Sequence, residues 1–64
     1  MLISKSAAKR IIREAGAVRV GDGAAAEFAN MINSFAYGVA SKAVKLAAHA
    51  KRKTVEKSDI KLAR

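Results

Sequence analysis

The feature that most limits how this chain can fold is a long segment, residues 22–50, in which only Gly38 interrupts a helical pattern after Gly23 at its start. The sequence contains no proline, and one glycine inside a helix costs only about 1 kcal/mol relative to alanine. We therefore predict a helix of about 28 residues and about 42 Å. Its apolar residues cover an arc of roughly 200°, which is too wide for one neighbouring helix to cover. These apolar residues are Phe28, Ala29, Ile32, Phe35, Ala36, Val39, Ala40, Ala43, Val44, Leu46, Ala47 and Ala50.

The chain is too short to cover such a helix alone. It has 64 residues, and a domain of this size buries only about 60% of the surface that its unfolded chain exposes. Small domains usually compensate with disulfides, a metal or a partner chain. The sequence has no cysteine, and the lone His49 cannot build a structural zinc site. We therefore expect a second protein chain, and neither a metal nor a cofactor.

Shorter helices are predicted on both sides of the long one. Residues 4–15 carry apolar side chains at helical spacing, with Ser4 or Ser6 as the cap and Gly16 in the left-handed position that ends a helix. Residues 57–64 predict a brief last helix. The expected architecture is all-α: one domain over residues 1–64, built as short helix, loop, long helix, loop, short helix.

The two connections are predicted as loops. Val18-Arg19-Val20 alternates in a way that suits extended backbone, and Asp22 is the expected cap of the long helix. After the long helix, residues 51–55 form a basic loop with a β-prone end.

The positive charge is strongly divided along the chain. Lys and Arg number 13 against 5 Asp and Glu, which gives a net charge of +8 and favours a polyanionic partner. Five of these cations lie at or before Arg19 and eight lie from Lys42 onward, so the middle of the long helix has none. A solvated surface is the alternative for either cluster, but two clusters flanking a cation-free apolar seam favour binding of phosphate.

Four other functional classes fit the sequence poorly. The longest stretch without charge, residues 28–41, is too short and too polar for a membrane span, so we expect no membrane partner. A membrane-active peptide usually carries interfacial tryptophan, which is absent here. Phe28 and Phe35 belong to the core stripe, so a platform that stacks single-stranded bases is not expected. No arrangement of nucleophile and base indicates an enzyme.

Several short stretches match one family in order and spacing. They are Arg10-Ile11-Ile12-Arg13, Ala15-Gly16-Ala17, Arg19-Val20, Ala40-Ser41, Ala43-Val44-Lys45-Leu46-Ala47, His49-Ala50, Arg52-Lys53-Thr54-Val55, Asp59-Ile60 and Leu62-Ala63. With these stretches the sequence resembles archaeal-type histones over essentially its whole length, without gaps.

The resemblance implies a handshake dimer, in which the first loop of each chain lies beside the second loop of its partner. In such a dimer Arg19 would enter the minor groove of DNA next to Lys53 and Thr54 of the other chain, with little dependence on sequence. The predicted DNA-binding residues are Lys9, Arg10, Arg13, Arg19, Lys51, Lys53 and Thr54.

The resemblance also implies three structural roles. Arg52 and Asp59 would form a salt bridge that fixes the second loop. Gly16 would lie where successive turns of a wrapped array approach each other, although a plain helix stop remains equally open. The residues that would join one dimer to the next are Leu46, His49, Asp59 and Leu62.

Some positions depart from the family pattern. Lys51 stands where the family often has glycine, which adds charge and raises the question of the loop's path. Gly21 replaces a hydroxyl cap, which would move capping to Asp22. Charged side chains often found in the family are replaced by Val18, Asn30, Tyr37 and Ala48.

We therefore expect a cytoplasmic, nucleoid-associated protein that compacts, bends or wraps double-stranded DNA. It would act as a homodimer, with a related histone as an alternative partner and stacked dimers as larger assemblies. The competing hypothesis is a histone-fold module that heterodimerises within a transcription or repair complex and touches DNA only incidentally.

Overall fold

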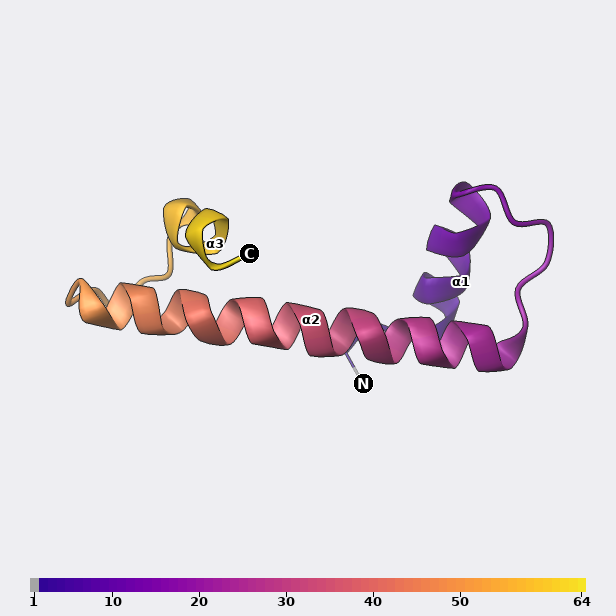
Figure 1. Cartoon of the computed structure of the whole chain (residues 1–64), viewed down its shortest axis with the longest axis horizontal. Helices are drawn as coiled ribbons and strands as arrows, with labels where there is room; N and C mark the ends of the chain where they lie inside the picture. The colour runs from indigo at the N-terminus through magenta and orange to yellow at the C-terminus, as the bar shows by residue number, and fades with distance from the viewer. Residues whose placement is uncertain (1) are drawn as a thin grey trace. The chain divides into compact units, whose positions relative to one another are not determined.

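The computed structural model describes residues 2–64, so Met1 of the predicted domain lies outside it. Within these residues the chain forms three helices and no strand: α1 (Lys5–Glu14), α2 (Asp22–His49) and α3 (Lys57–Ala63) (Figure 1). The all-α prediction and the order of the helices are confirmed. Each helix begins and ends within one residue of its predicted bounds.

Both ends of α1 are closed by local hydrogen bonds. The Ser4 hydroxyl accepts a bond from the Ala7 amide at 3.1 Å, which selects Ser4 over Ser6 as the cap. At the other end Gly16 has φ +121°, and its amide donates to the Arg13 carbonyl at 2.9 Å. The Ala17 amide donates to the Ile12 carbonyl at 3.3 Å, which completes a Schellman motif. Gly16 is therefore required by the backbone conformation that stops α1.

The prediction that Asp22 caps α2 is wrong. The first helical hydrogen bond runs from the Ala25 amide to the Gly21 carbonyl at 3.0 Å, which puts Gly21 in the cap position and Asp22 inside the first turn. The Asp22 carboxylate instead pairs with Lys9 on α1 at 2.9 Å. The carboxylate that we expected to cap α2 is therefore engaged in an ion pair with Lys9 of α1.

Helix α2 ends with the same motif as α1, but without a glycine. Lys51 has φ +61°, its amide donates to the Ala48 carbonyl at 2.9 Å, and the Arg52 amide donates to the Ala47 carbonyl at 2.9 Å. The left-handed region strains L-residues because Cβ crowds the carbonyl oxygen. Helix α2 therefore ends with the hydrogen bonds of a Schellman motif, and Lys51 adopts a strained backbone conformation to form them.

Residues 1–34 and 35–64 form two compact units. In the first, α1 lies beside the N-terminal half of α2 (Figure 1), with Ala8, Ala25 and Ala29 buried. Asn33 also holds the start of the chain, because the Ile3 amide donates to its Oδ1 at 2.9 Å and its Nδ2 donates to the Ile3 carbonyl at 3.3 Å.

The second unit packs α3 against the C-terminal half of α2. Its buried residues are Ala43 and Ala47 of α2 and Ala63 and Asp59 of α3. Asp59 is the one buried charged residue among those that the structure describes.

Alanine supplies all the buried hydrophobic residues of the described chain, and no large side chain is fully buried. Phe35 of α2 is 70% exposed and Leu62 of α3 is 74% exposed. The other large hydrophobic side chains with substantial exposure are Leu2, Ile11, Val18, Met31, Tyr37, Val44, Leu46, Val55 and Ile60. A single copy therefore leaves half of the residues of the predicted apolar arc exposed to solvent.

None of the helices described between residues 2 and 64 combines the length and the apolar character that a membrane crossing requires.

Candidate nucleic-acid interface

The first group of cations lies on α1. Lys5, Lys9 and Arg13 follow each other at four-residue spacing, which places them on one side of the helix. We call these three residues the α1 cationic stripe. Arg10 lies about a quarter turn away from it and is exposed, as is Arg13. The pairing of Arg10 with Glu14 that the spacing allows is not formed among the described residues, so Arg10 has no ion-pair partner there.

Lys9, at the middle of the stripe, is the one member with an ion-pair partner in the described chain. Its Nζ lies 2.9 Å from Oδ1 of Asp22; the lysine side chain is 31% exposed and that of the aspartate 76% exposed. The hydrogen bond from Lys9 lowers the pKa of Asp22 below its usual value, and the positive charges of Lys9 and Lys5 add to this effect. The positive charges of Lys5 and Lys9, two residues of the α1 cationic stripe, therefore both stabilise the ionised form of Asp22.

Arg19 lies in the loop between α1 and α2 and is exposed. It forms no ion pair with any of residues 2–64. Its neighbour Val18 is 92% exposed, so this loop presents one cation and one apolar side chain outward.

The second group of cations lies on the loop after α2, and Arg52 fixes that loop. Its guanidinium donates to both carboxylate oxygens of Asp59 at 2.9 Å and to the Thr54 carbonyl at 3.1 Å. The Glu56 carboxylate lies 3.5 Å from the same group. Such a two-pronged contact fixes orientation as well as distance. The structure thus brings together the two residues expected to form a salt bridge.

Asp59 also organises the start of α3. Its Oδ2 accepts a bond from the Glu56 amide at 2.8 Å, which satisfies a free donor at the helix N-terminus. The hydrogen bonds from Arg52 and then from Glu56 lower the pKa of Asp59 to about 2, although burial acts in the opposite direction. The Asp59 carboxylate raises the pKa of Arg52 in turn. The loop and α3 are therefore joined by an ionised pair over the whole physiological range.

Lys51, Lys53 and Thr54 are exposed on this anchored loop. Neither lysine forms an ion pair within the described residues, so both ammonium groups face solvent. The Arg52–Asp59 contact holds the backbone that carries them, which favours a defined position for each cation.

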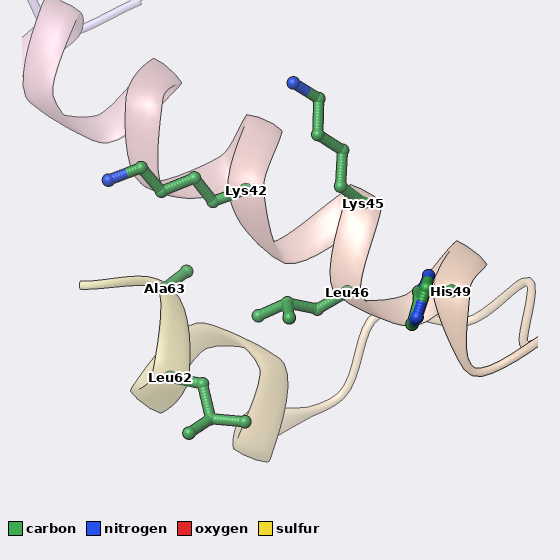
Figure 2. Close-up of a pocket in the computed structure, with 6 residues that line it drawn as sticks. All are labelled: Lys42, Lys45, Leu46, His49, Leu62 and Ala63. Carbon is green, nitrogen blue, oxygen red and sulfur yellow. The ribbon is translucent and has the colours of Figure 1, made fainter.

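Leu46, His49 and Leu62 line an open concavity of about 440 Å³ with Lys42, Lys45 and Ala63 (Figure 2). Leu46 and His49 come from α2 and Leu62 from α3, and Leu46 points toward α3 in the close-up. Asp59, the fourth residue of the expected dimer-to-dimer contact, is 3% exposed and bonded within its own chain. The other three are brought together on one surface.

Gly16 has open space around it. A Cβ at this position would meet no atom within 4 Å, so its positive φ, and not crowding within the chain, is what demands glycine. Lys51 has the same positive φ at the end of α2, at the position where the family often has glycine.

Two polar contacts between segments that are distant in sequence were not anticipated. They are the Lys9–Asp22 pair and the Asn33–Ile3 clamp. The Glu56–Asp59 capping contact did have a signal, namely an acidic residue three positions after the first residue of the motif.

With this geometry established, comparison with known proteins defines the class. Residues 1–63 match the family described as histone-like transcription factor (CBF/NF-Y) and archaeal histone. The chain belongs to this family, which comprises archaeal histones and histone-like transcription factors and not enzymes, and the predicted resemblance is confirmed.

Individual relatives support the same assignment. The chain is 48% identical over 54 residues to probable archaeal histone 3 of Methanocaldococcus jannaschii, which covers 84% of this chain and 81% of that protein. It is 46% identical over 54 residues to one of the chains of archaeal histone HAN1 of Thermococcus zilligii, with the same two shares. It is also 47% identical over 58 residues to histone H4 of Encephalitozoon cuniculi, which covers 91% of this chain and 56% of that protein.

Proposed function

We propose that this chain is a chromosome-associated architectural protein that dimerises and compacts double-stranded DNA. The observation that carries this proposal is the division of its surface: two exposed groups of cations flank a helix whose cation-free middle exposes large apolar side chains. A protein with this division can use its apolar surface for another chain and its cations for phosphate.

The apolar surface supports a homodimer. A buried methyl group contributes roughly 0.8 kcal/mol, whereas full burial of a Phe or Leu side chain contributes about 1.5–3 kcal/mol. One copy buries alanines and leaves Met31 and Phe35 exposed near the centre of α2. A second copy of α2 is the partner that the proposal assigns to this surface, and a related histone is the alternative.

The cations support binding to the phosphate backbone. Arg19 is proposed to enter the minor groove, because it is exposed on a short loop and has no ion-pair partner in the described chain. Recognition of this kind depends on charge and on DNA flexibility, so we expect little sequence preference. The phosphate ligands are proposed to be Lys9, Arg10, Arg13, Lys51, Lys53 and Thr54.

The concavity lined by Leu46, His49 and Leu62 is proposed as the contact through which dimers join on DNA. Asp59 contributes indirectly, because it fixes α3 through Arg52 and has little surface left for another chain. Gly16 is proposed to permit close approach between successive turns of a wrapped array, since nothing in its own chain occupies the space beside it.

The family also includes histone-like transcription factors, which favours a heterodimeric module as the second candidate. Sedimentation of the purified chain separates the two candidates. A stable homodimer supports the architectural proposal, whereas a monomer that associates only with a related histone-fold chain supports the second candidate.

The decisive test is a titration of long duplex DNA of random sequence at several salt concentrations, read by band shift and by nuclease protection. We expect affinity to fall steeply with salt and protection to grow in regular steps as dimers join. Weak, salt-insensitive binding would contradict the proposed function. Protection without steps would contradict only the proposed joining of dimers.

A further inference from the structure

We propose that Asp22 lowers the affinity of this protein for DNA by holding Lys9 in an internal ion pair. The inference rests on the proposed function, because it concerns one cation of the proposed DNA-binding surface. It assigns to Asp22 a role as a positioning residue that limits how many α1 cations reach phosphate.

The geometry makes the carboxylate a direct competitor of phosphate. Charge-assisted bonds between an ammonium group and an anionic oxygen are about 2.7–2.9 Å long. Lys9 Nζ and Asp22 Oδ1 are 2.9 Å apart. The carboxylate therefore occupies a position on the ammonium group that a DNA phosphate oxygen would otherwise take.

The surroundings strengthen the effect. Lys9 is the middle residue of the α1 cationic stripe, and the charge of Lys5 also acts on Asp22. A phosphate that approaches the stripe meets the negative charge of Asp22 as well as the positive charges of Lys5 and Lys9. The carboxylate thus weakens the contact whether or not Lys9 leaves it.

No other cation proposed to bind DNA is restrained in this way within the described chain. Arg10, Arg13 and Arg19 in the first unit have no acidic partner there, and neither do Lys51 and Lys53 in the second. The Arg52–Asp59 pair involves an arginine that holds the loop and is not one of the proposed ligands. Asp22 therefore distinguishes Lys9 from the rest of the surface.

The test compares the full-length variants Asp22→Asn and Glu27→Gln in titrations of duplex DNA. Both substitutions remove one negative charge from the first two turns of α2, but Glu27 is exposed and forms no ion pair among residues 2–64. For Asp22→Asn we expect about a threefold gain in affinity per protomer at low salt, as for release of an exposed ion pair. The slope of log affinity against log salt should steepen by about 0.9 per protomer.

Lys9 identifies the source of the gain. In the double variant Asp22→Asn/Lys9→Gln the gain and the steeper slope should both disappear. Equal behaviour of Asp22→Asn and Glu27→Gln would overturn the inference, and so would a gain that survives the loss of Lys9.

A thermal melt of each variant adds a readout for a purely structural role. If the pair served only to join α1 to α2, Asp22→Asn would melt at a lower temperature and bind DNA no more tightly, which also overturns the inference. Failure of the unmodified protein to bind DNA would instead overturn the proposed function on which the inference rests.

Discussion

Replacement of Lys51 separates the backbone strain at the end of α2 from the charge of the second loop. Lys51 has φ +61°, a conformation that costs an L-residue about 1–2 kcal/mol and glycine almost nothing. Glycine in turn loses about 0.5–1 kcal/mol more conformational entropy on folding than alanine does. The variants Lys51→Gly and Lys51→Ala lose the same charge, so the difference between them reports the backbone alone.

The expected difference follows from these two effects. Lys51→Gly should be more stable than Lys51→Ala by about 1 kcal/mol per protomer, or about 2 kcal/mol for a dimer. With an unfolding entropy of about 2.1 cal/mol/K per residue, the melting temperature of a dimer of two 64-residue chains should differ by about 7 °C. Denaturant titration should show a higher midpoint for the glycine variant with an unchanged m-value.

Gly16 provides the matched control. It closes α1 with the same motif, has φ +121°, and has open space where a Cβ would lie. Gly16→Ala should therefore destabilise the protein by at least about 1 kcal/mol per protomer through the backbone and not through a clash within the chain. The reasoning is refuted if Lys51→Gly is no more stable than Lys51→Ala while Gly16→Ala shows its loss.

Three further predictions concern other parts of the surface. The pKa of Asp59 is about 2 in the folded chain and 3.8 in the unfolded chain, so its ionised form stabilises the fold fully above pH 4 and loses this effect as the pH falls toward 2. Melting temperatures between pH 7 and pH 2 should consequently decline less steeply in Asp59→Asn, and an identical acid limb would contradict the assignment. Arg19→Ala should weaken binding to all DNA sequences and reduce the salt slope by about one unit, and an unchanged slope would exclude a phosphate or groove contact. Leu46→Glu should leave dimers folded by circular dichroism and sedimentation but abolish cooperative binding to long DNA, and undiminished cooperativity would exclude the concavity as the joining surface.

The sequence predicted the helices well because their signals are local. Apolar spacing defined α2, and Ser4 and Gly16 marked the two ends of α1. The cap of α2 was mispredicted because a cation on another helix, Lys9, attracts the Asp22 carboxylate. A local pattern contains no information about such a competitor.

The candidate site was only partly accessible from the sequence. The division of the cations was visible in the order of residues, but the roles of Arg52 and Asp59 came from the resemblance to a family and not from their spacing. The lysine itself gave no sign of the left-handed backbone at position 51, because lysine rarely adopts it, and only the glycine that the family often has there pointed to it. Only a three-dimensional structure places these groups.

The core of buried alanines has a consequence for the life of the protein in a cell. Because one copy shelters so little apolar surface, folding and association in the proposed dimer amount to a single equilibrium, and its position depends on protein concentration. A newly made chain at low abundance would remain open to proteases until it met a partner. Exchange of protomers between such dimers would then require both chains to unfold, so the composition of the dimers would follow the concentrations of the chains that compete for each partner.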